Sequence, residues 1–122
     1  MRLNADCVRV VILTIENNLG LGKIMRFSEL MSYPLVQSFT RDDVEYSLQQ
    51  LTAENMIDCK IRRYLNNSFD YTIKDITPEG HKLCDSFRND SLWEKIKPQL
   101  TDISTIGTLL SSAISIAASL AP

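Results

Sequence analysis

A strongly marked helix that leads directly into two β-rich segments constrains the fold of this chain most. Thr40–Asp43 supplies an N-cap hydroxyl and two carboxylates for the positively polarised first turn of that helix. Apolar residues follow at Val44, Leu48 and Leu51, which indicates that one helix face is turned towards a core. Asn55 tolerates the left-handed conformation that ends helices, so the helix is expected to stop there.

The two β-rich segments predict a hairpin. Met56–Leu65 and Phe69–Ile76 are enriched in Ile, Tyr and Phe, and Asn66–Ser68 between them suits a turn. Thr77–Glu79 then places an N-cap, a proline and an acid in the order that starts a helix. Helix, hairpin and helix are therefore expected in succession, without a linker.

Shorter elements are predicted before this unit. Apolar residues in Asn4–Asn17 have helical spacing, with Asn4 as the N-cap. Lys23–Phe27 is a candidate strand. Ser28 is expected to cap a brief helix that runs through Tyr33.

These elements predict a mainly α fold with a small β-hairpin, that is, an α+β winged helix-turn-helix with extra C-terminal helices. The domain is expected to span residues 1–100, with the third helix as the potential recognition element and the hairpin as the wing. One extra helix is expected to be capped by Asp90 or Ser91 and to hold Trp93 against the first helix.

Composition narrows the classes of function. A chain of 122 residues suits one domain and excludes a two-domain enzyme that binds a large cofactor and a substrate. Cys7, Cys59 and Cys84 are too far apart in sequence for a disulfide framework or a zinc site, which favours a reducing, cytoplasmic compartment. His81 is the only histidine, so no metal cluster and no catalytic pair can use more than one imidazole. No catalytic residue, metal ligand or cofactor is predicted, so the protein is expected not to be an enzyme.

The segments after the hairpin resemble a known family. Ile76–Leu83, Asp85–Asp90 and Trp93–Lys97 are similar to a small winged-helix family of unknown function that is common in bacterial and prophage genomes. That family also has a capped helix leading into a hairpin, which corresponds to Thr40–Ile57 here. The resemblance implies a winged-helix fold and a prophage-like context, and it implies no established activity. It also places His81 in a family motif, where this residue is expected to pack or hydrogen-bond within the first turn of its helix.

The resemblance covers residues 40–97, is looser over residues 1–39 and is weak in the tail. One departure lies just after the capped helix, where Asn55 and Met56 replace the usual glycine and apolar residue. Because asparagine also tolerates the left-handed backbone geometry, the fold implied by the resemblance is unchanged.

Two candidate DNA-contacting elements differ in charge. Residues 41–55 contain one base and four acids, net −3, which disfavours phosphate contact although glutamine suits base edges. Residues 56–76 have a net charge of +1, and arginines beside the turn match phosphate oxygens. The alternative is that these strand cations only protect a sheet edge and keep it soluble. The predicted nucleic-acid-binding residues are Arg41, Tyr46, Gln49, Gln50, Lys60, Arg62, Arg63, Asn66 and Asn67.

Residues 101–122 are predicted to form a C-terminal helix that carries no charge from Ile103 onwards. Its apolar residues recur every three or four positions, and hydroxyl side chains lie on the other face. The helix could pair with another chain or fold back on its own domain, and a membrane span is disfavoured by its many Ser and Thr residues. The predicted oligomerisation residues, for a homodimer or a higher oligomer, are Ile103, Ile106, Leu110, Ala113, Ala117 and Leu120.

Two functions from different classes follow. The first is a cytoplasmic, DNA-binding transcriptional regulator of prophage or mobile-element origin, which contacts DNA through the basic wing and dimerises through its tail. The alternative is a protein-interaction module whose acidic third helix binds and inhibits a basic partner, a host or phage nucleic-acid-binding protein. The charge of the hairpin favours the first function, and the charge of the third helix favours the second.

Overall fold

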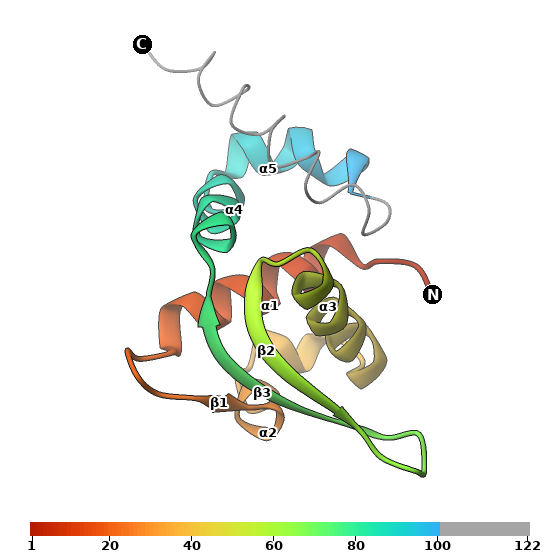
Figure 1. Cartoon of the computed structure of the whole chain (residues 1–122). Helices are drawn as coiled ribbons and strands as arrows, with labels where there is room; N and C mark the ends of the chain where they lie inside the picture. The colour runs from red at the N-terminus through yellow and green to blue at the C-terminus, as the bar shows by residue number, and fades with distance from the viewer. Residues whose placement is uncertain (101–122) are drawn as a thin grey trace.

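A computed structural model of the chain describes residues 1–100 as an α+β fold with five α-helices and a three-stranded antiparallel sheet (Figure 1). The predicted tail helix and its six oligomerisation residues lie outside the described residues. The elements in chain order are α1 (Ala5–Asn18), β1 (Met25–Arg26), α2 (Phe27–Leu30), the 3-10 turn η1 (Val36–Ser38), α3 (Arg41–Ala53), β2 (Ile57–Arg63), β3 (Phe69–Ile76), α4 (Pro78–Arg88), α5 (Asp90–Ile96) and the 3-10 turn η2 (Lys97–Gln99).

The predicted starts of α1, α3 and α4 are confirmed. The side-chain oxygens of Asn4, Thr40 and Thr77 each accept a hydrogen bond from the backbone N–H three residues further on. The predicted end of α3 is also confirmed, because Asn55 has a φ of 60°. Local side-chain chemistry thus sets the limits of the three longest helices.

The predicted start of α2 is wrong. Ser28 lies inside the helix, whose N-cap residue is Arg26 and has no side-chain capping bond, and the helix ends at Leu30 instead of Tyr33. Packing positions α2 instead, because the buried Phe27 ring lies 5.2 Å from the ring of Tyr71 on β3. Tertiary contact therefore overrides the weak capping signal at this helix.

The predicted cap of α5 is also wrong. Asn89 both ends α4 and caps α5, with its side-chain oxygen accepting from the backbone N–H of Leu92, so neither Asp90 nor Ser91 has that role. The extended backbone of Asn89 places its amide at the start of the new helix.

The predicted position of Trp93 is confirmed. Its ring packs edge-on against Phe87 of α4 with centroids 5.1 Å apart, and the guanidinium of Arg9 on α1 lies 4.9 Å from the Trp93 ring centre. Arg9 also pairs with Asp90 at 2.9 Å. The first helix and the C-terminal helices are therefore held together by one aromatic and cationic cluster.

The sheet has the order β1-β3-β2, so the predicted hairpin is confirmed and has a third strand. The short β1 pairs with the middle of β3, with Met25 opposite Ile73 and Arg26 opposite Thr72. This third strand lies within the predicted strand Lys23–Phe27, whose pairing partner the sequence did not indicate. Asn67 in the turn has a φ of 65°, as a tight connection requires.

The core lies between the helices and one face of the sheet (Figure 1). Val44, Leu48 and Leu51 of α3 are fully buried, as predicted, and the three cysteines are buried too. The core residues contributed by the sheet are Met25, Ile57, Cys59, Tyr71, Ile73 and Ile76. The opposite face of the sheet is left facing outward.

The side chain of His81 bonds to another helix, whereas its backbone N–H donates to the carbonyl oxygen of Thr77 in the first turn of α4. Its Nδ1 lies 2.8 Å from Oε2 of Glu16 on α1, and Arg88 bonds to the same carboxylate, so α4 is clamped to α1. Burial by itself would raise the pKa of Glu16, but the bonds from His81 and Arg88 outweigh it and lower that pKa. No helix among residues 1–100 has the length and apolar character needed to cross a bilayer.

Candidate functional site

The hairpin projects from the helices and presents two faces of different character (Figure 1). Because successive side chains of a strand point to opposite faces, neighbours in sequence are separated in space. Arg63, opposite Phe69, lies on the side of α3, whereas Arg62 and Lys60 lie on the outward side. The pair of arginines predicted to act together is therefore divided between the two faces.

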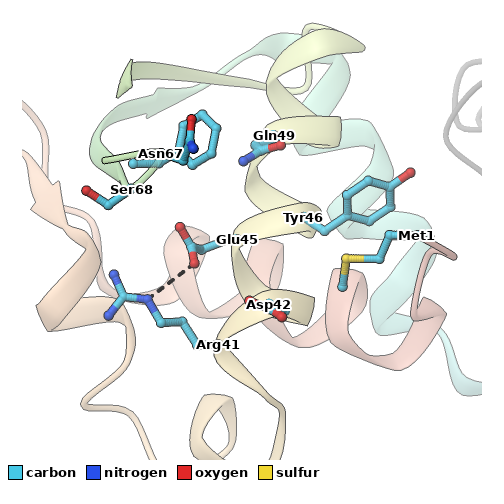
Figure 2. A pocket seen from close by; sticks show the side chains of 9 residues that line it. Met1, Arg41, Asp42, Glu45, Tyr46, Gln49, Asn67 and Ser68 are labelled. Carbon is cyan, nitrogen blue, oxygen red and sulfur yellow. Dashed lines mark hydrogen bonds and ion pairs between the residues drawn. The ribbon is translucent and has the colours of Figure 1, made fainter. Parts of the chain in front are cut away.

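A groove of about 450 Å³ lies between α3 and the hairpin tip (Figure 2). Glu45 and Gln49 point from α3 towards the hairpin, while Tyr46 points to the other side, where Met1 lies. The lining residues are Met1, Arg41, Asp42, Glu45, Tyr46, Gln49, Asn67, Ser68 and Phe69. Four predicted nucleic-acid contacts, Arg41, Tyr46, Gln49 and Asn67, are thus brought to one groove.

Tyr71 engages two of the polar side chains in this groove. Its hydroxyl donates to Oε1 of Glu45 at 3.0 Å and accepts from Nε2 of Gln49 at 2.9 Å. Burial, together with the charge of Glu45, raises the pKa of Tyr71 far above its ordinary value, so the hydroxyl keeps its proton. Gln49, predicted as an exposed base reader, is half-buried and already hydrogen-bonded within the fold.

The cations on this side of the sheet are also engaged. Arg41 pairs with Glu45 at 3.2 Å, and its guanidinium lies 5.0 Å from the centre of the Phe27 ring. Arg63 donates to Oδ1 of Asn67 at 2.7 Å and lies 5.9 Å from the centre of the Phe69 ring. These contacts satisfy part of the hydrogen-bonding capacity that a phosphate would use.

The outward face of the sheet carries a second set of cations. Arg26 on β1 and Lys60 on β2 both stand opposite Thr72 of β3, and Arg62 stands opposite Asp70. A hollow of about 190 Å³ is lined by these five residues. All three cations are exposed, and none of them takes part in an ion pair among residues 1–100.

Sequence reasoning missed Arg26. The residue lies in the predicted strand Lys23–Phe27, but nothing in the sequence indicates which strand that segment pairs with. Pairing with β3 places Arg26 on the same face as Lys60, 34 positions away in the chain. The period-two pattern of β2 identified the rest of the set, since Lys60 and Arg62 share a face.

A third concavity shares lining residues with both the groove and the outward hollow. It has a volume of about 410 Å³ and shares Arg41 and Phe69 with the groove and Arg26 and Asp70 with the outward hollow. Four cations, Arg41, Arg26, Lys60 and Arg62, therefore line the three concavities.

Two further predicted contacts lie apart from these concavities. Gln50 is half-buried on α3 and lines none of the three concavities, and the side-chain oxygen of Asn66 accepts from the backbone N–H of Ser68 within the turn. Leu65 at the tip is fully exposed, and Tyr64 beside it is 43% exposed.

The cysteines are placed in the core, as predicted. Burial raises the pKa of the Cys7 and Cys59 thiols to about 11 each and that of Cys84 still further. The three thiols are therefore protonated at neutral pH, which suits small apolar core residues. Within residues 1–100, no three His, Cys, Asp or Glu side chains are close enough to hold a metal ion.

Comparison with known proteins gives a family but no relative of known activity. A model of a family of hypothetical proteins, DUF2513, matches residues 2–107. No curated protein matches the chain, and neither does any solved structure. Because the matched residues cover most of the chain, the protein belongs to the DUF2513 family of hypothetical proteins.

Proposed function

We propose that this chain is a non-enzymatic winged-helix protein that binds DNA and acts as a transcriptional regulator. The element order α1-β1-α2-α3-β2-β3 and the sheet order β1-β3-β2 support the winged-helix assignment, with β2 and β3 as the wing. The resemblance of residues 40–97 to winged-helix proteins common in prophages supports an origin in a prophage or mobile element. DNA in the cytoplasm is the proposed partner.

One observation carries the proposal: a projecting hairpin holds exposed cations that make no ion pair among the described residues. Lys60 and Arg62 lie on its outward face, with Arg26 beside them on β1. Cations in such a position attract the phosphate backbone and release its counterions, which makes binding sensitive to salt. A hairpin whose cations only kept the sheet edge soluble would not bind DNA in this way.

The direct test is binding of the full-length protein to a labelled mixed-sequence duplex, followed by fluorescence anisotropy at 50 mM and 150 mM salt. Salt-sensitive binding, weakened on every sequence by Arg62→Ala combined with Arg63→Ala, is expected. Absence of binding at 50 mM salt would contradict the proposal. An affinity unchanged by the double substitution would show that the wing does not contact the DNA.

Self-association through residues 101–122 is proposed from the spacing of the six apolar positions. Light scattering of the full chain and of a chain ending before Thr101 tests it. The full chain is expected to have the mass of a dimer or a larger oligomer, and the shortened chain that of a monomer. Equal masses per particle, after allowing for the residues removed, would refute this part of the proposal.

A second function is favoured by one specific observation, the acidic start of α3. Asp42 is exposed and lines the groove together with Glu45, and Asp43 beside it is half-buried. Such a surface fits a basic protein partner, as expected of a module that inhibits a nucleic-acid-binding protein. Binding of a Lys- and Arg-rich peptide that is lost on Asp42→Asn, in a chain that does not bind DNA, would favour this function.

A further inference from the structure

We infer that DNA docks on the outward face of the sheet and not on α3, with Arg26, Lys60 and Arg62 holding backbone phosphates in the hollow that they line. This inference rests on the proposed function and names the surface that performs it. It reverses the usual assignment of the third helix of such a fold as the element that enters the groove.

The first argument is the charge of the two surfaces. The outward hollow has three cations and one acid, Asp70, whereas residues 41–55, which include α3, have one cation and four acids. A duplex presents about one negative charge per 1.7 Å of its axis, so it is drawn to the first surface and repelled by the second.

The second argument is the availability of the side chains. Arg41 on α3 is paired with Glu45, and Gln49 is bonded to Tyr71, so contact with DNA there would first break bonds of the fold. The cations of the hollow make no ion pair among residues 1–100, and one oxygen of Asp70 already accepts from the backbone N–H of Tyr71. A phosphate can therefore approach the hollow without displacing an internal partner.

The third argument is the distribution of charge along the hairpin. Asp58 and Asp75 face each other near the helices, beyond an irregularity in the register, and Lys74 precedes Asp75 there, whereas Lys60, Arg62 and Arg63 lie in the half nearer the tip. The net charge of +1 over residues 56–76 is therefore the sum of a basic half near the tip and an acidic half near the helices. The basic half is the part that a duplex reaches first.

The spacing of the cations suits several phosphates. Lys60 and Arg62 are two residues apart on one strand, about 7 Å, and Arg26 lies two strand spacings from Lys60, about 10 Å. The hydroxyl of Thr72 stands between Arg26 and Lys60 and adds a donor that suits a phosphate oxygen. Three separate charges on one face of the sheet are thus available to neighbouring phosphates.

The experiment compares three proteins by anisotropy with a 20-bp mixed-sequence duplex over 50–200 mM salt. The first is the unmodified full chain. The second carries Arg26→Gln, Lys60→Gln and Arg62→Gln. The third is a control with the same charge change, Lys82→Gln, Lys95→Gln and Lys97→Gln, in α4, α5 and η2 on the far side of the molecule from the hairpin tip (Figure 1).

The sheet-face variant should bind at least about 10-fold more weakly at 100 mM salt. The plot of log K against log salt should become less steep by about 2.7, which is about 0.9 for each of the three lost phosphate contacts. The control should keep a slope within about 0.5 of the unmodified chain. All the substituted cations are exposed, and circular dichroism during heating checks that both variants remain folded.

Two single variants of α3 separate this inference from the proposed function. If DNA docks on the sheet face, Asp42→Asn and Gln50→Ala should each change the affinity less than about 2-fold. The docking surface is wrong, and the function stands, if the unmodified chain binds DNA but the sheet-face variant binds as the control does. The same conclusion follows if Asp42→Asn tightens DNA binding and Gln50→Ala weakens it. If the unmodified chain does not bind at 50 mM salt, the function itself is wrong.

Discussion

Both sides of the hairpin carry charged side chains, but the two sides differ in how far these side chains are bonded within the fold. On the α3 side, Arg41, Glu45 and Gln49 are tied to one another or to Tyr71, and Arg63 is bonded to Asn67. On the outward side, Arg26, Lys60 and Arg62 line an open hollow and make no ion pair among residues 1–100.

The difference shows that charge alone does not reveal whether a side chain is free of partners within the fold. A polar side chain that is hydrogen-bonded within the fold contributes to its stability, whereas one without an internal partner can bind a ligand at little cost to the fold. Substitutions on the α3 side should therefore change stability, and substitutions on the outward side should change binding.

The largest effect is expected where both sides of the hairpin are anchored to the helices. A Cβ on Gly80 of α4 would collide with the carbonyl oxygen of Met56 and lie 2.6 Å from Cγ2 of Ile76. Gly80→Ala should lower the free energy of unfolding, measured in urea, by about 3 kcal/mol or more. Because the sheet would lose its position on the helices, the contrast between the bonded side chains of one side and the exposed cations of the other should disappear as well. Gly20→Ala is the matched control, since its Cβ meets only the flexible Lys23 side chain, and equal losses in the two variants would contradict the prediction.

Removal of the hydroxyl at the centre of the α3 side should cost less. Tyr71→Phe leaves Glu45 and Gln49 without a shared partner and should lower the free energy of unfolding by about 1–2 kcal/mol. The salt dependence of the proposed DNA binding should stay unchanged. Tyr64→Phe at the exposed tip should alter neither quantity, and a Tyr71→Phe protein as stable as the unmodified chain would show that this network is not stabilising.

The bonds from His81 and Arg88 of α4 to Glu16 of α1 predict how the stability of the protein changes at acid pH. The lowered pKa of Glu16 means that its stabilising effect is complete above its ordinary value of 4.5 and is lost as the pH falls through the lowered value. Glu16→Gln should cost about 1 kcal/mol at pH 7, measured by urea unfolding, and should reduce the loss of stability between pH 5 and about pH 2. Glu29→Gln on the exposed face of α2 serves as control, and a pH profile that is the same in both variants would refute the assignment.

The smallest effect compares one arginine from each side directly. Arg41→Gln should lower the free energy of unfolding by about 0.5–1 kcal/mol, because it loses the pair with Glu45 and the contact with Phe27. Arg62→Gln should change it by less than about 0.5 kcal/mol while weakening DNA binding. If Arg62→Gln were the more destabilising of the two, the outward cations would have a structural role instead.

Most of the secondary structure could be predicted because its signals are local. The caps at Asn4, Thr40 and Thr77 and the turn at Asn67 depend on side chains and backbone within a few residues, and all four have the predicted role. The cap of α2 could not be predicted because packing of Phe27 against Tyr71 decides where that helix begins.

The candidate site was predicted only in part, because its residues are defined by pairing and by partners distant in sequence. Lys60 and Arg62 follow from the alternation of a strand, but Arg26 joins them only through the pairing of β1 with β3. Gln49 was predicted to contact DNA bases because its amide suits base edges. In the structure that amide donates to the hydroxyl of Tyr71, 22 positions away in the chain.

By itself, the sequence determined where the helices and the hairpin form and which strand residues share a face, since capping, turn geometry and periodicity act over a few residues. Only the tertiary structure decided which charges remain available. The pairing of β1 with β3 places Arg26 beside Lys60, and the packing of α3 on the sheet brings Glu45 and Gln49 to Tyr71. The physical reason is that the availability of a polar group depends on the partners that folding brings to it, and these partners lie far away in the chain.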